Sequence, residues 1–113
     1  MIGFALLCCC EHHDEWRARQ AVKALASAPE LQVPHYMQRV ISFGRLALVD
    51  IEQVIQGAEP AGRLRLLEAL RKIGDPEAIP LARIIARWDA NPLVKKEAKI
   101  TLQALLEQGP VQD

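Results

Sequence analysis

Side chains able to do chemistry crowd into one short stretch, CCCEHHDEW, at residues 8–16. It holds three adjacent cysteines, two adjacent histidines and three carboxylates. Thiolates and imidazoles are preferred zinc ligands, and a reactive thiol can also serve redox chemistry. The stretch therefore raises the hypothesis of a small metal-binding or thiol-redox protein using Cys8, Cys9, Cys10, His12 and His13.

The spacing of these residues argues against a metal site. Neighbouring residues on a helix diverge by about 100°, so three cysteines in a row cannot converge on one tetrahedral ion. Outside the stretch, His35 is the only further histidine in the sequence. The apolar stripe of the following segment, projected backwards, would also bury Glu11 and Asp14. We therefore expect a helix boundary near His12 to Asp14, with Asp14 as the N-cap of the next helix, and no metal or cofactor.

Other catalytic patterns are missing from the sequence. The hydroxyl side chains are Ser27, Ser42, Tyr36 and Thr101, and none stands beside a plausible base. No glycine-rich phosphate loop is present. Lys plus Arg equals Asp plus Glu at 14 each, and this zero net charge argues against nucleic acid or an anionic membrane as partner. We expect a protein that is not an enzyme.

The cysteines also bear on the cellular compartment. All three fall in one run, so the sequence has no spaced disulfide framework, which favours a reducing cytoplasm. The opening MIGFALLCCC has no basic side chain before its short apolar run, and Leu7 precedes Cys8 where a lipoprotein cleavage site requires a small residue. We expect a cytoplasmic protein without a membrane-spanning segment.

The elements that must position these side chains are helices. Aromatic residues are only 4% of the chain, whereas Ala, Leu and Ile are plentiful, which favours helices over strands. Helical spacing of apolar residues predicts successive helices within 14–27, 29–42, 42–60, 61–74, 76–88 and 92–107. Gly74 is the expected stop of one helix and Asp75 the expected N-cap of the next.

The segment 76–88 has apolar residues on two adjoining stripes, Ile79/Ala82/Ile85 and Leu81/Ile84/Trp88. A helix that is apolar around most of its girth is expected to be flanked on both sides. We therefore expect Trp88 to lie in the core, the alternative being an aromatic contact residue for a partner.

A family resemblance rests on LRKIGDPEAIPLARIIARWDANPLVKKEAKITLQALLE, residues 70–107. The Gly-Asp-Pro-Glu-Ala-Ile-Pro turn at 74–80 and the Asp-x-Asn-Pro turn at 89–92 resemble HEAT-like repeats of the short bacterial and lyase type. Residues 14–26 look like the first helix of another such unit. The resemblance implies right-handed stacks of helix pairs with a curved surface for a partner, usually a protein.

The fold expected from the sequence is therefore all-α, a short HEAT-like α-solenoid of about six antiparallel helices. Residues 1–113 would form a single HEAT-like helical-repeat domain. Within it, 1–13 is an apolar N-terminal segment, 14–60 a degenerate repeat region and 61–107 the best-formed repeats.

Several activities known in HEAT-like families have no support in the residues. HEAT-like hydroxylases bind iron through His-Glu dipeptides, and this sequence contains none. DNA-binding HEAT-like glycosylases need a strongly basic concave surface, which the zero net charge opposes. A lyase-type cofactor-handling accessory protein stays open as an alternative.

The function expected is a non-catalytic protein-protein interaction or scaffold module with a protein partner. Its predicted binding residues are basic side chains on consecutive helices of the best-formed repeat, Arg83, Arg87, Lys95, Lys96 and Lys99. They would meet an acidic patch on the partner and steer association.

The N-terminal residues suggest self-association as well. Ile2 to Cys10 are apolar all round, and an exposed patch of that size exceeds what monomers usually tolerate. We expect this segment to pack against a second copy, giving an isologous homodimer, or against a partner.

Overall fold

The computed structural model describes the backbone of residues 2–108 and the side chains of residues 13–108. Over residues 2–108 every regular element is a helix and no strand occurs, so the predicted all-α class is confirmed. The helices are α1 (Ile2–Ser27), α2 (Val33–Phe43), α3 (Leu48–Ile55), α4 (Pro60–Ile73), α5 (Ile79–Trp88) and α6 (Pro92–Gln108). Short 3-10 turns are η1 (Glu30–Gln32), η2 (Gly44–Ala47) and η3 (Pro76–Ala78).

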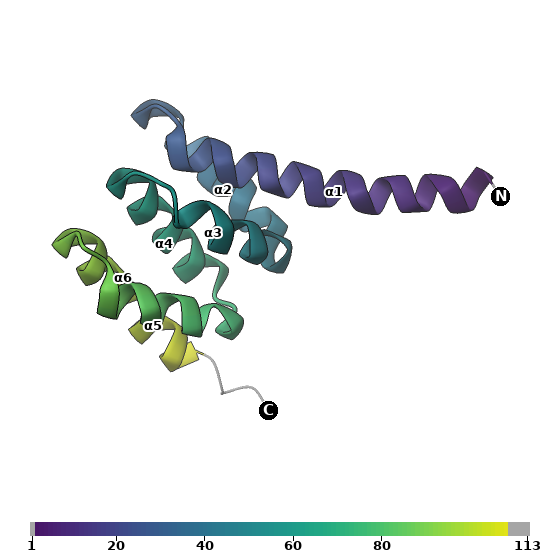
Figure 1. Cartoon of the computed structure of the whole chain (residues 1–113). Coiled ribbons are helices and arrows are strands. Elements are labelled where there is room, and N and C mark those ends of the chain that lie inside the picture. The colour runs from purple at the N-terminus through teal and green to yellow at the C-terminus, as the bar shows by residue number, and fades with distance from the viewer. Residues whose placement is uncertain (1, 109–113) are drawn as a thin grey trace.

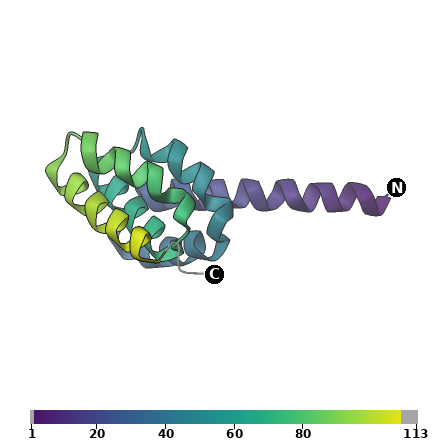
Figure 2. The same cartoon turned by 90° about the horizontal axis from the view of Figure 1, so that it is seen from below.

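The helices lie in successive pairs: α1 with α2, α3 with α4, and α5 with α6 (Figure 1). Helix α4 is the centre of the arrangement, because it packs against α1, α2, α3 and α6. Viewed from below, α5 and α6 lie side by side at one end of the stack (Figure 2). This end pair carries the predicted binding residues.

Helix α1 runs unbroken from Ile2 to Ser27, so the helix boundary predicted near His12 to Asp14 is wrong. Asp14 lies inside the helix and is not an N-cap. The prediction assumed that the buried stripe continues backwards, but burial begins only at Ala18 among the described side chains, and residues 13–17 are exposed. Where a helix buries no face, polar residues can stand on any side of it.

The other helix ends follow local chemistry. At the end of α4, Gly74 has φ +73°, a left-handed conformation that glycine adopts without penalty, so the predicted stop is confirmed. Asp75 is an N-cap as predicted, since its carboxylate accepts a hydrogen bond from the Glu77 amide at 2.9 Å, but it caps the 3-10 turn η3, and α5 follows only from Ile79. The single helix predicted over 42–60 is shorter, Leu48–Ile55, because Gly44 at φ +58° ends α2 and the 3-10 turn η2 precedes α3.

The core is built from the stripes that the sequence predicts. In α1 the buried residues are Ala18, Ala21, Val22 and Leu25, and in α4 they include Leu66, Leu67 and Leu70. Helices α1 and α4 come unusually close at Gly62, where an added Cβ would lie 2.6 Å from the Ala26 carbonyl oxygen. Only glycine permits that approach.

The second apolar stripe of α5 is not buried, which corrects the expectation for this helix. Ala82 and Ile85 are in the core, but Ile84 is 57% and Trp88 74% exposed. The expected core position of Trp88 is therefore wrong. Among the described residues α5 packs mainly on α6 and η3, and a hollow lined by Leu81 and Ile84 separates it from α3, so no neighbouring helix covers this stripe fully.

Candidate partner-binding surface

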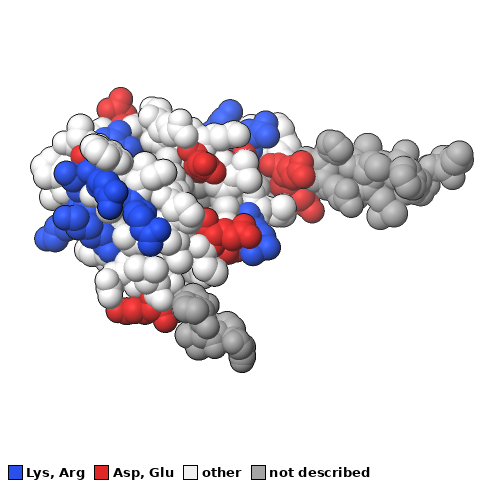
Figure 3. All heavy atoms as spheres, turned by 60° about the horizontal axis from the view of Figure 1, so that its bottom comes forward, with Lys and Arg blue, Asp and Glu red and all other residues white. Residues whose placement is uncertain are grey.

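The predicted basic residues gather on the outer face of the α5–α6 pair. Arg83 and Arg87 lie one turn apart on α5, and Lys95 and Lys99 one turn apart on α6. All four line one open hollow of about 450 Å³. Figure 3 shows a group of Lys and Arg side chains on the face that α5 and α6 form. The structure therefore brings together four of the five predicted binding residues; Lys96 is exposed but does not line the hollow.

The buried faces of α5 and α6 determine that these basic side chains point outward. Helix α5 is anchored by buried Ala82, Ile85 and Ala86, and α6 by Val94, Ala98 and Leu105. The α6 anchor includes a polar contact, because the Thr101 hydroxyl donates to the Leu67 carbonyl of α4 at 3.1 Å. With these faces held inward, the basic residues project outward.

The turn between the two helices is tied by side-chain caps. Asn91 accepts hydrogen bonds from the amides of Leu93 and Val94, which begin α6. Asp89 accepts from the Asn91 amide at 2.9 Å and pairs with Arg63 of α4, whose Nε lies 2.9 Å from Asp89 Oδ2. The Asp-x-Asn-Pro sequence thus fixes the angle at which α5 and α6 enclose the hollow.

The four cations differ in their partners from five of the other seven arginines, whereas Arg17 and Arg39 likewise have no ion pair within residues 13–108. Arg19, Arg45, Arg63, Arg65 and Arg71 each pair with a carboxylate. Within residues 13–108, none of Arg83, Arg87, Lys95 and Lys99 takes part in an ion pair or a side-chain hydrogen bond. The hollow is therefore a concentration of positive charge left uncompensated by the described side chains.

The floor of the hollow is apolar. Ala86, buried, and Leu102, half-buried, lie between the two basic rows. Sequence reasoning missed both residues as candidates because each also fits an ordinary core stripe. A signal was available for Ala86, which is the only small apolar residue between Arg83 and Arg87 on that turn.

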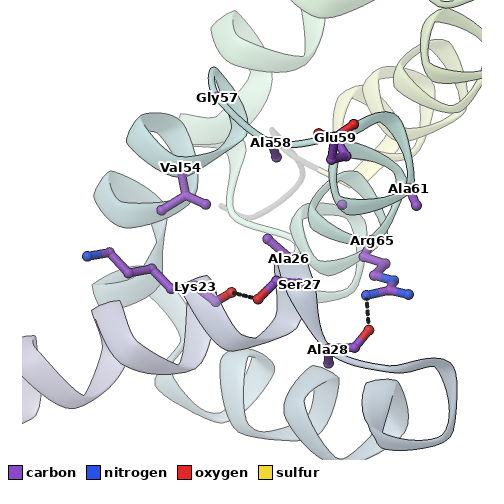
Figure 4. A pocket seen from close by; sticks show the side chains of 11 residues that line it. Lys23, Ala26, Ser27, Ala28, Val54, Gly57, Ala58, Glu59, Ala61 and Arg65 are labelled. Carbon is purple, nitrogen blue, oxygen red and sulfur yellow. Dashed lines mark hydrogen bonds between the residues drawn. The ribbon is translucent and has the colours of Figure 1, made fainter.

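A larger hollow, about 530 Å³, lies where the C-terminal end of α1 meets α3 and α4 (Figure 4). Two of its polar side chains, Ser27 and Arg65, are hydrogen-bonded to nearby backbone. Arg65 donates to the carbonyl oxygens of Ala28 at 2.7 Å and Leu25 at 3.2 Å, and the Ser27 hydroxyl donates to the Lys23 carbonyl. These bonds satisfy the end of α1, so this hollow has a structural explanation.

A third hollow, about 390 Å³, separates α3 from α5 and is lined by apolar residues that include Ile55, Leu81 and Ile84. The Arg63–Asp89 pair lies at its edge. At this hollow α5 stands away from α3.

The described side chains form no metal site: within residues 13–108, no three His, Cys, Asp or Glu side chains gather as ligands. Cys8, Cys9, Cys10 and His12 lie outside the described side chains. His13 is exposed and stacks with Trp16 at a ring-centroid distance of 6.2 Å. The Ser42 hydroxyl donates to the Arg39 carbonyl within its own helix, and the Thr101 hydroxyl donates to the Leu67 carbonyl of α4.

Comparisons of the chain with protein-family models, curated proteins and solved structures gave no match. Among the described residues, no helix is long and apolar enough to cross a membrane.

Proposed function

We propose that this protein is a non-catalytic protein-binding or scaffold module of the cytoplasm. The observation that carries the proposal is the convergence of Arg83, Arg87, Lys95 and Lys99 on one hollow without an ion pair among the described residues. Basic residues that serve only solubility are usually dispersed over a surface and mixed with acids. Four on one concave face instead match an acidic patch on a partner.

We further propose that the helices form a short HEAT-like α-solenoid of about six antiparallel helices. Two features support this: the pairs follow one another along the stack, and the two turns that resemble HEAT-like repeats contain the N-caps Asp75 and Asn91. A solenoid presents consecutive helices to a partner as one continuous surface. Cytoplasmic location is supported by the cysteine run at 8–10, which has no disulfide spacing.

Charged and apolar residues contribute differently to binding at this surface. Ion pairs exposed to water contribute only about 0–1 kcal/mol each, so the four cations raise the association rate and select an acidic partner. Most of the affinity must come from apolar contacts, for which Trp88 (74% exposed) and Ile84 lie on the adjoining face of α5.

The test is quantitative capture from an extract of the source organism by the immobilised full chain. We expect a specific partner to be retained by the wild type, released by added salt, and lost from the Arg83→Glu/Arg87→Glu variant. A matched control, Arg17→Glu/Lys23→Glu, reverses two exposed cations on α1 and should retain the partner. Equal capture by both variants at every salt concentration would place the binding surface elsewhere.

Self-association is a second part of the proposal. The apolar run at 2–10, outside the described side chains, would join two copies as an isologous homodimer. This leaves the α5–α6 face available in each copy for a protein partner.

A further inference from the structure

The two basic rows of the hollow have a definite spacing. Residues four apart on a helix are separated by about 6 Å along its axis, so Arg83 and Arg87 form one row and Lys95 and Lys99 another. The rows stand on adjacent helices that a three-residue turn, 89–91, joins in opposite directions. A ligand in the hollow would therefore have positive charge on both flanks over at least one helical turn.

Between these rows the surface changes character. Ala86 ends at its Cβ and is buried, so the floor is low, and Leu102 adds an apolar wall. An anion alone would satisfy the cations and leave the exposed part of Leu102 in contact with water. A ligand that uses the whole hollow must have an apolar centre and acidic flanks.

From this cross-section we infer that the hollow binds an acidic amphipathic helix of a partner protein. A large apolar side chain of that helix lies over Ala86 and against Leu102, and carboxylates on either side of it meet the two basic rows. The inference rests on the proposed function and adds the chemical class of the partner. Helical residues at i and i+4 share a face, so acidic residues at that spacing match each row.

The lining residues favour this ligand over nucleic acid. Single-stranded nucleic acid is held by aromatic side chains on which bases stack, and no aromatic residue lines the hollow. The net charge of the chain is also zero.

The experiment measures binding of fluorescent peptides to the full chain by anisotropy. The first peptide is a Glu/Leu amphipathic helix with a leucine stripe between two glutamate rows. The second has the same composition with the leucines scattered, and the third is polyglutamate. We expect the first to bind at least about tenfold more tightly than either control, a difference of about 1.4 kcal/mol.

Variants separate the charged rows from the floor. Arg83→Glu/Arg87→Glu should weaken binding of the amphipathic peptide at least about tenfold and flatten its salt dependence. Leu102→Gln should weaken binding several-fold and leave the salt dependence unchanged. Arg17→Glu/Lys23→Glu is the control and should bind as the wild type does. Because Leu102 is half-buried, circular dichroism checks that the Leu102→Gln variant is folded. The variant Lys95→Ala/Lys99→Ala tests the α6 row without changing the residues of the floor.

Three outcomes would overturn the inference: equal binding of all acidic peptides, tighter binding of single-stranded RNA, or tighter binding of phosphatidylserine vesicles. These results are distinct from failure of the proposed function. If all the acidic peptides bind equally but the Arg83→Glu/Arg87→Glu variant still fails to bind a protein partner, the proposed binding surface is supported and the proposed helical ligand is not.

Discussion

At the scale of single residues, the arginines divide into two groups by their partners. Arg65 is only 15% exposed and closes the end of α1 by donating to the carbonyls of Leu25 and Ala28. Arg83 and Arg87 contact no carboxylate among the described residues and line the basic hollow. The same side chain therefore serves stability in one place and, in our proposal, recognition in the other.

This division predicts that the two groups contribute unequally to the free energy of unfolding. Arg65→Met keeps the aliphatic stem but removes two charge-assisted hydrogen bonds, one to Leu25 of α1 and one to Ala28 just after it, so we expect a loss of about 2 kcal/mol in the free energy of unfolding. Arg83→Met, the matched control, should change it by less than about 0.5 kcal/mol. Urea denaturation followed by circular dichroism measures both. Equal losses would contradict the distinction.

Asp75 is the residue whose ionisation the fold uses most clearly. The Arg45 side chain donates to its carboxylate at 2.9 Å, and the Glu77 amide also donates to it. The Arg45 hydrogen bond first, and then the amide, hold the pKa of Asp75 below its ordinary value. The carboxylate is thus more acidic in the folded chain than in the unfolded chain.

The sign of the pH dependence follows from that shift. The stabilising contribution is complete above the unfolded pKa, near about 4, and is lost as the pH falls through the lower folded pKa. Asp75→Ala should cost about 1 kcal/mol at pH 7, as loss of an N-cap does, and much less at pH 2. Asp75→Asn keeps a capping side chain and should remove the part of the pH dependence of stability that Asp75 contributes. A deficit of Asp75→Ala that is equal at both pH values would disprove the assignment.

At the scale of helices, the sequence predicted the all-α class and the positions of most helices, but not how much of each helix surface is buried by its neighbours. Helical spacing located the buried faces of α1, α4 and α6, and Gly74 and Asp75 marked a helix end and a helix start as observed. The errors have one physical cause. An apolar stripe shows that a face can be buried, but only the neighbouring helices decide whether it is.

Trp88 and the α1 segment before Ala18 illustrate this limit. The stripe of Leu81, Ile84 and Trp88 would be core if a helix covered it, but a hollow lined by Leu81 and Ile84 separates α5 from α3, and Trp88 is 74% exposed. The candidate site was likewise predicted only in part from the sequence. The cations were identified from helix positions, whereas the apolar floor at Ala86 and Leu102 became evident only from the packing of α5 on α6.

The contact of α1 with α4 gives a prediction at this scale. Gly62→Ala would place a Cβ 2.6 Å from the Ala26 carbonyl oxygen, so the two helices must move apart. We expect a loss of about 1–3 kcal/mol from that overpacking, which outweighs the gain of about 1 kcal/mol in helix propensity.

Gly57→Ala is the matched control, because nothing lies within 4 Å of a Cβ there and its φ is not positive. It should be neutral or slightly stabilising. Thermal unfolding of both variants compares them directly. If Gly62→Ala were as stable as Gly57→Ala, the close approach of α1 and α4 would not constrain the fold.

At the scale of the whole molecule, charge is distributed unevenly although its sum is zero. Residues 61–107 hold nine basic and six acidic side chains, and four of the basic ones line the hollow. A neutral protein with one basic face has little long-range attraction for polyanions but can orient an acidic partner at short range. Association through this face should therefore slow as salt is added.

The apolar run at 2–10 leads to the last prediction, which concerns assembly. Its large side chains include Ile2, Phe4, Leu6 and Leu7, and burying each contributes about 1.5–3 kcal/mol, enough to hold two copies together. Light scattering should therefore give twice the chain mass of 12.6 kDa for the intact protein. Deletion of residues 1–10 should give a folded monomer, and so should the full-length variant Phe4→Lys/Leu7→Lys. Leu31→Lys replaces a residue that is 95% exposed and should stay dimeric. A monomeric intact protein would rule out the dimer, as would a lysine variant that keeps the dimer mass.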